Sequence, residues 1–136
     1  MKYILLLITL LLFTSFASAT GGAGTQPPLE SKKWFEDDYV KYHCKGEVEY
    51  YLPDRAFVDC LTETHAIEYD YGKKWAESLG QALYYSAATG KKPGIVLIVE
   101  PETKDRYLTR LNKAISIIPC KPSEAPCIDI WTIEKR

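Results

Sequence analysis

The most apolar stretch of the chain lies at its beginning. Lys2 precedes an almost uninterrupted apolar run over residues 4–13, and the small residues Ala17, Ser18 and Ala19 follow that run. A basic start, a short apolar core and an A-x-A site are typical of a secretory signal peptide. The apolar core is too short to span a bilayer comfortably. We therefore expect residues 1–19 to direct export to the periplasm or the medium, with no stable membrane insertion after their removal.

A change of pattern marks the start of the predicted domain. Residues 20–30 read TGGAGTQPPLE and have a single large apolar residue, which is typical of a flexible leader. From Ser31 onwards the apolar positions become periodic. Residues 31–136 are therefore predicted to form one domain.

The first half of this domain predicts one helix and three strands. Ser31 is a suitable N-cap for a helix over residues 31–44. Strands are expected at residues 47–52, 56–61 and 65–71, because apolar and polar positions tend to alternate there between short turns. Three short strands joined by tight turns indicate an antiparallel meander.

The second half predicts alternating helices and strands. We expect a helix over residues 73–89 closed by Gly90, a buried strand at 95–99, a helix from Asp105 to about Ile118, and a strand at 128–133. The order α-β-β-β-α-β-α-β predicts an α/β or α+β fold, with helices packed on a mixed sheet.

Composition narrows the function classes. Of the 136 residues, 46% are hydrophobic and 26% charged, which excludes a disordered or fibrous chain. The net charge is −1, so the chain has no global basic excess of the kind that marks proteins that coat nucleic acid. Any contact with nucleic acid must be local or mediated by a metal ion.

The four cysteines suggest disulfides in an oxidising compartment, and they admit three pairings. Cys120 and Cys127 flank a short Pro-rich loop, so a local bridge is our best prediction. That pairing leaves Cys44 with Cys60. The alternative is that Cys44 and Cys60 are buried small thiols.

Acidic residues gather on the predicted meander. Glu68 and Asp70 are two positions apart and share a strand face, and the turn before them brings Asp59 of the preceding strand alongside. Clustered carboxylates repel one another unless they share a proton or a cation, and Mg²⁺ prefers such oxygen ligands. The alternative is a solvated acidic strand face.

The helix after this strand adds a cation and an amide. Lys74 and Gln81 are seven positions apart and share a helix face, with Lys74 close to the point where Asp70 leaves the sheet. A lysine beside a metal site could stabilise negative charge at a phosphorus centre. Lys73 is expected to pair with Glu77 as a surface charge.

These elements and residues resemble the PD-(D/E)XK nuclease superfamily, which has the restriction-endonuclease-like fold. Residues 58–85, VDCLTETHAIEYDYGKKWAESLGQALYY, and residues 94–100, GIVLIVE, look like a small bacterial family of that superfamily. The resemblance covers about residues 31–133. It implies Mg²⁺- or Mn²⁺-dependent hydrolysis of phosphodiester bonds and nucleic acid as a partner.

The resemblance also implies site residues. Asp59 matches the first carboxylate of the motif and Glu68 the second, while Glu36 matches an acidic residue that many members add to the metal site. Gln81 matches a polar helix position near the site. Asp54, in Pro53-Asp54, spells the start of the motif, but it falls in a turn.

The sequence departs from the motif at one position. Asp70 stands where the motif expects a lysine, and Lys74 is the natural replacement from the neighbouring helix. With Asp70 supporting the metal and Lys74 the transition state, the chain would be an exported nuclease. The alternative is a catalytically inactive secreted binding domain that keeps the fold.

The remaining basic residues and histidines give weaker signals. Lys32, Lys33, Lys91 and Lys92 are candidates for tracking phosphates, although solubilising surface roles are the simpler interpretation. His43 and His65 have no zinc-ligand spacing, and a turn or strand-edge role is favoured for His65. Tyr85, near Gln81, is the one tyrosine that we would place close to the site.

Overall fold

A computed structural model describes residues 32–121 and 127–136. The predicted signal peptide, leader and Ser31 cap lie outside the described residues, as does the loop 122–126. The elements are α1 (Glu36–His43), β1 (Glu47–Tyr51), β2 (Phe57–Leu61), β3 (His65–Tyr71), the 3₁₀ turn η1 (Gly72–Lys74), α2 (Trp75–Thr89), β4 (Lys92–Val99), α3 (Pro101–Ile115) and β5 (Asp129–Glu134). The predicted order of helices and strands is confirmed.

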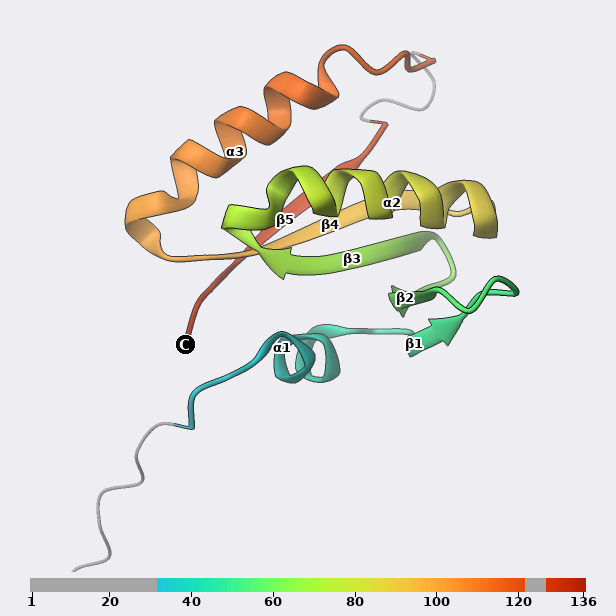
Figure 1. Cartoon of the computed structure of the whole chain (residues 1–136), viewed down its shortest axis with the longest axis horizontal. Coiled ribbons are helices and arrows are strands. Elements are labelled where there is room, and N and C mark those ends of the chain that lie inside the picture. Colours follow the sequence, from blue (N-terminus) through green and yellow to red (C-terminus); the bar gives the residue numbers. More distant parts are fainter. Residues whose placement is uncertain (1–31, 122–126) are drawn as a thin grey trace, which may run out of the picture. The chain divides into compact units, whose positions relative to one another are not determined.

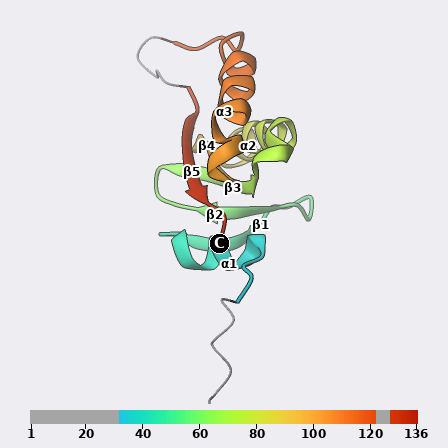
Figure 2. The ribbon, with the colours of Figure 1, turned by 90° about the vertical axis from the view of Figure 1, so that its left-hand side faces the viewer.

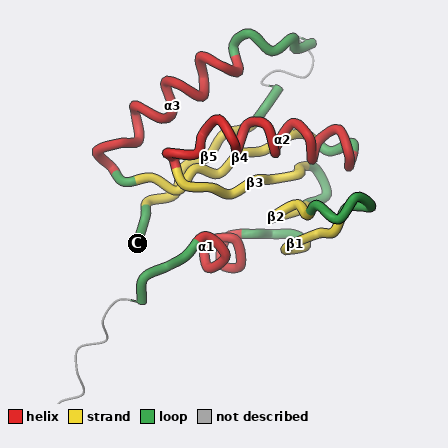
Figure 3. The backbone as a smooth tube through the Cα atoms, viewed as in Figure 1, coloured by secondary structure: helices red, strands yellow, loops and turns green. Residues whose placement is uncertain are grey.

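The five strands form one mixed sheet in the order β1-β2-β3-β4-β5. The pairs β1–β2 and β2–β3 are antiparallel, while β3–β4 and β4–β5 are parallel. Parallel neighbours need a crossover, which α2 supplies between β3 and β4 and α3 between β4 and β5. Figure 1 shows α2 and α3 on one side of the sheet and α1 on the other, and Figure 3 shows the same arrangement by element type. The mixed α+β class is therefore confirmed.

The two faces of the sheet bury separate apolar clusters. Beneath α2 and α3, the buried cluster consists of Ala82, Ile95, Leu97, Val99, Leu111 and Ile128. Beneath α1, it consists of Tyr39, Val40, Cys60, Tyr69, Val96 and Ile98. Successive residues of β4 thus enter opposite clusters, as expected of a strand covered on both faces. The view in Figure 2 shows α1 and the α2–α3 pair on either side of the strands.

Three predicted helix starts differ from the structure. The first helix, predicted from Ser31, begins at Glu36 with Phe35 as its N-cap. The last predicted helix begins at Pro101 instead of Asp105, with Glu100 as its N-cap. Proline fits the first helical position because the N–H that it lacks has no partner there anyway. The helix predicted from Lys73 begins as the 3₁₀ turn η1, and α2 proper starts at Trp75. Gly90 closes α2 in the left-handed conformation (φ 70°), as predicted.

Both predicted disulfides are present. Cys44 pairs with Cys60, and Cys120 pairs with Cys127. The first bridge ties the end of α1 to β2, and Cys60 lies in the cluster beneath α1. Such pairings are compatible with an exported protein. Among the described residues, no helix is long and apolar enough to cross a membrane.

Candidate functional site

The candidate site begins where β2 and β3 separate. The two strands are paired only at Cys60↔Ile67 and Leu61↔Ala66. Beyond these pairs the Asp59 side chain bridges the strands, since its Oδ2 accepts a hydrogen bond of 2.8 Å from the backbone N–H of Tyr69. A carboxylate therefore takes the place of a ladder carbonyl, and it is held facing β3.

Glu68 is the partner of Asp59. Its side chain is almost fully buried, with 4% of the residue exposed, and it is hydrogen-bonded to Asp59. Two carboxyl groups can form such a bond only by sharing a proton. Burial, and then the charge of Asp59, raise the pKa of Glu68 to about 10. Burial also raises the pKa of Asp59, although the Tyr69 N–H opposes this.

A second pair of carboxyl groups joins α1 to β3. Glu36, in the first turn of α1, is hydrogen-bonded to Asp70, which is 1% exposed. Burial, and then Asp70, raise the pKa of Glu36 to about 7. Glu36 therefore carries a proton for part of the time near neutral pH, and this proton links the two side chains.

The cation of the site is Lys74, at the end of η1. Its Nζ lies 3.3 Å from Oδ1 of Asp70. Partial burial acts to lower the pKa of Lys74, but the neighbouring Asp70 raises it. The 43% exposure of the Lys74 side chain leaves its ammonium group accessible to an incoming anion.

Two side chains of α2 hold Glu68 from the other side. The Gln81 side chain is oriented with its amide nitrogen towards Glu68, because only this orientation satisfies both amide atoms. In this orientation the nitrogen donates hydrogen bonds to both carboxylate oxygens of Glu68. The Tyr85 hydroxyl is also hydrogen-bonded to Glu68, and burial followed by that carboxylate raises the pKa of Tyr85. Tyr85 is one helical turn after Gln81, so helical spacing was the signal that placed it near the site.

The six predicted site residues thus form two contact groups, one around Glu68 and one around Asp70, whose carboxyl groups influence one another electrostatically. The six residues are Glu36, Asp59, Glu68, Asp70, Lys74 and Gln81. They come from α1, β2, β3, η1 and α2. Asp54, the alternative first carboxylate, lies in the β1–β2 turn, where it accepts hydrogen bonds from Tyr84 and from the N–H of Ala56. Asp54 is thus engaged by Tyr84 and Ala56, whereas Asp59 contacts Glu68.

The donor atoms of the cluster suit a hard cation in type but are not arranged around one point. Within residues 32–121 and 127–136, no three His, Cys, Asp or Glu side chains form a group that could hold a metal ion as they stand. The carboxyl groups are instead joined in pairs by protons. A cavity of about 220 Å³ reaches Glu36 and Asp59, and Asp37 and Glu49 also line it. A cation entering there would have to displace the shared protons and reorient the carboxylates.

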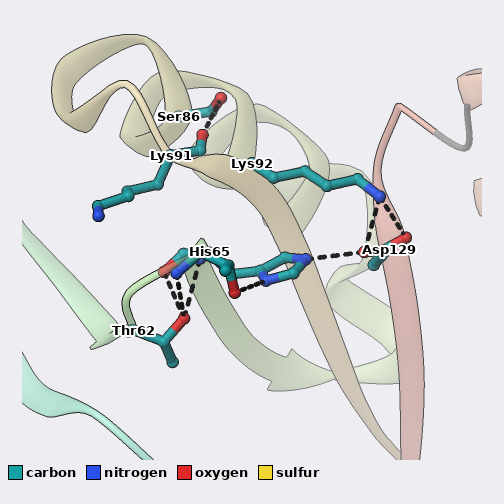
Figure 4. Close-up of polar contacts among 7 residues, drawn as sticks. Thr62, His65, Ser86, Lys91, Lys92 and Asp129 are labelled. Atoms are coloured by element: carbon teal, nitrogen blue, oxygen red, sulfur yellow. Dashed lines mark hydrogen bonds and ion pairs between the residues drawn. The ribbon is translucent and has the colours of Figure 1, made fainter. Parts of the chain in front are cut away.

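His65 lies at the amino-terminal end of β3, a central strand of the sheet. Its Nδ1 lies 2.7 Å from the Thr64 hydroxyl, and its Nε2 lies 2.7 Å from Oδ2 of Asp129 on β5. Lys92 of β4 approaches the same carboxylate at 2.8 Å (Figure 4). These contacts bind the amino-terminal ends of the three parallel strands together, and they also engage Lys92.

Three of the four candidate phosphate-tracking lysines are held by protein groups. Lys91 donates to the carbonyl of Glu63 at 2.5 Å, and Lys32 forms an ion pair with Asp38 at 3.0 Å. Lys33 lines a cleft at the carboxyl ends of β3 and β4. The predicted ion pair of Lys73 with Glu77 is not among the ion pairs of the described residues.

Comparisons of the chain with protein-family models, curated proteins and solved structures found no match.

Proposed function

We propose that the chain is an exported, metal-dependent phosphodiesterase that hydrolyses nucleic acid. In this proposal the fold is restriction-endonuclease-like and the site is a variant of the PD-(D/E)XK motif. One observation carries the proposal: the carboxyl groups of Glu36, Asp59, Glu68 and Asp70 gather around the point where β2 and β3 separate, with the Lys74 ammonium beside them. Burying several carboxyl groups costs stability, which indicates a site with a chemical use.

Asp59 and Glu68, with Glu36 or Asp70 in support, would hold Mg²⁺ or Mn²⁺. Their donors are carboxylate oxygens, the ligands that hard divalent cations prefer. When bound, such a cation lowers the pKa of a water molecule and stabilises charge on a phosphate group. The raised pKa values mean that Glu68 and Glu36 must release protons before they can ligate.

Lys74 supplies the role of the missing motif lysine in this proposal. Its ammonium group is anchored at Asp70, which occupies the motif position, and it remains 43% exposed. It would contact a phosphate oxygen and stabilise the negative charge that develops during attack. Gln81 orients Glu68 from α2, so its loss would misplace a ligand without removing one.

The test is cleavage of DNA and RNA by the processed protein, with Mg²⁺ or Mn²⁺ and with EDTA. We expect divalent-dependent cleavage that is lost in Glu68→Gln and Asp59→Asn and reduced in Lys74→Met. The matched control is Glu102→Gln, because Glu102 is exposed on α3, away from the cluster. If no nucleic acid is cleaved and divalent ions do not raise the melting temperature, the phosphodiesterase proposal is wrong.

The second candidate is a secreted binding domain that keeps this fold without catalysis. It is favoured by the presence of Asp70 at the motif lysine position and by the pairwise arrangement of the carboxyl groups. A rise in melting temperature with Mg²⁺ or Mn²⁺, lost in Glu68→Gln, but without cleavage of any nucleic acid, would select this alternative.

A further inference from the structure

A second cavity lies at the carboxyl ends of β3 and β4. It has a volume of about 420 Å³, within the range of small-molecule sites, which begins at roughly 300 Å³. Its floor includes Gly72 and Val99, and it reaches the beginning of α3. None of the four clustered carboxylates lines it. At this edge of the sheet η1 contacts both β4 and α3, and Figure 1 shows the chain passing there from β4 into α3. In α/β proteins ligands commonly bind at the carboxyl ends of parallel strands.

The charge of this cleft is positive although the chain as a whole is slightly acidic. Lys33, Lys73 and Lys135 line it together with one carboxylate, Glu100. Lys135 Nζ lies 2.7 Å from Oε1 of Glu100, and these two charges neutralise each other. Among the described residues neither Lys33 nor Lys73 forms an ion pair with a carboxylate, although Lys73 is close enough to Glu100 to help lower the pKa of that carboxyl group. Three lysines and one carboxylate leave the lining with a net charge of +2.

Aromatic rings line the same cleft. Tyr71, Tyr107 and Phe35 contribute to its wall, and Phe35 is 63% exposed. Arg106 holds Tyr107 in place: its Nη2 donates to the phenol oxygen at 2.9 Å, and its Cζ lies 4.7 Å from the ring centroid. A Cβ atom at Gly72 would lie 2.6 Å from the Tyr107 ring. The absence of a side chain at Gly72 thus allows this ring to approach η1.

The start of α3 contributes few donors to the cleft. The backbone N–H groups of Thr103 and Lys104 donate to the Glu100 carbonyl at 3.0 and 3.1 Å, and the Thr103 hydroxyl donates to the same oxygen. Binding of an anion would therefore depend on the lysines and not on the helix terminus.

We propose that this cleft binds a small organic phosphate that carries a planar ring, of the nucleoside monophosphate class. Its phosphate would lie between Lys33 and Lys73, since the net positive charge of the lining matches a dianion. Its ring would pack against Tyr71 or Phe35, because aromatic side chains accept any planar base. This site is separate from the carboxyl cluster and does not depend on the phosphodiesterase proposal.

The test is calorimetric titration of the processed protein, in EDTA, with AMP, adenosine and inorganic phosphate. AMP is expected to bind more tightly than either adenosine or inorganic phosphate. Lys33→Gln and Lys73→Gln should each weaken AMP binding roughly tenfold, in line with the loss of one charge-assisted contact. Lys104→Gln, which changes an exposed lysine on α3, is the matched control and should bind as the parent does.

Glu68→Gln separates the two sites in the same assay, and it should bind AMP as the parent does. The proposal is overturned if AMP shows no binding at millimolar concentration. It is equally overturned if adenosine or inorganic phosphate binds as tightly as AMP, or if the Lys33 and Lys73 variants keep parental affinity. Loss of AMP binding in Glu68→Gln alone would assign the ligand to the carboxyl cluster instead.

Discussion

Replacing Glu68 by glutamine should make the stability of the protein less dependent on pH. Glutamine has nearly the shape of a protonated glutamate and keeps a donor and an acceptor in the same place. The variant therefore imitates the protonated carboxyl group that the Asp59–Glu68 pair holds in the folded state. It removes only the ability of that position to release its proton.

The raised pKa of Glu68 sets the sign of the effect. The pKa is about 10 in the folded protein, compared with an ordinary value of 4.5. Because the folded state holds the proton more tightly, its stabilising contribution is fully present below pH 4.5 and is lost as pH rises towards 10. One group titrating in this way changes the free energy of unfolding by at most about 1.4 kcal/mol per pH unit.

The choice of pH range isolates this effect. Burial lowers the pKa of His43 from 6.5, so this residue acts in the opposite direction only below about that pH. Glu36, with a pKa of about 7, adds to the Glu68 effect up to that value. Between about pH 6.5 and pH 8.5 we therefore expect the parent to lose about 3 kcal/mol of unfolding free energy, most of it from Glu68.

Urea unfolding of the parent and of two variants, in EDTA, measures this slope. The Glu68→Gln profile should be much flatter than that of the parent, and this variant should be the more stable protein at about pH 8.5. Glu102→Gln, the exposed control on α3, should follow the parent. A parent whose stability rises with pH over this range, or a Glu68→Gln variant that keeps the parental slope, would refute the reasoning.

Three further substitutions test the fold. Cys44→Ser with Cys60→Ser removes a bridge across 16 positions and should cost about 3 kcal/mol in urea unfolding. Reduction of the parent, which also opens Cys120–Cys127, should cost at least as much, and an unchanged stability of the double variant would contradict this reasoning. Gly72→Ala should cost about 1–3 kcal/mol, because the new methyl group meets the Tyr107 ring at 2.6 Å; unchanged stability would contradict this packing. Asp129→Asn removes the carboxylate that contacts His65 and Lys92 at the amino ends of β3 and β4, and should lower the melting temperature by several degrees, an effect of about 1–3 kcal/mol.

Local patterns in the sequence predicted most of the secondary structure. The third strand has the predicted bounds, His65–Tyr71, and Gly90 ends α2 as expected. These features depend on residues that are close along the chain, whose spacing is set by helix and strand geometry. The start of α3 was misplaced because its first turn, from Pro101, is polar and has no apolar periodicity to reveal it.

The sequence predicted which residues belong to the candidate site, but not which of their carboxyl groups pair with each other. Alternation along a strand placed Glu68 and Asp70 on one face, and the turn brought Asp59 to them. The proton-linked pairs Asp59–Glu68 and Glu36–Asp70 follow only from the separation of β2 and β3 and from the position of α1. Their raised pKa values depend on burial, which arises when distant segments pack together.

The cleft at the carboxyl ends of β3 and β4 was likewise not predictable from the sequence. Its lysines, Lys33, Lys73 and Lys135, lie far apart along the chain, and no spacing relates them. Residue order alone therefore determined the elements, the disulfide candidates and the acidic strand, because each depends on short-range geometry. Tertiary packing decided which charged side chains form ion pairs and which do not. The reason is that the energy of a charge depends on its neighbours in space and on the water that they exclude.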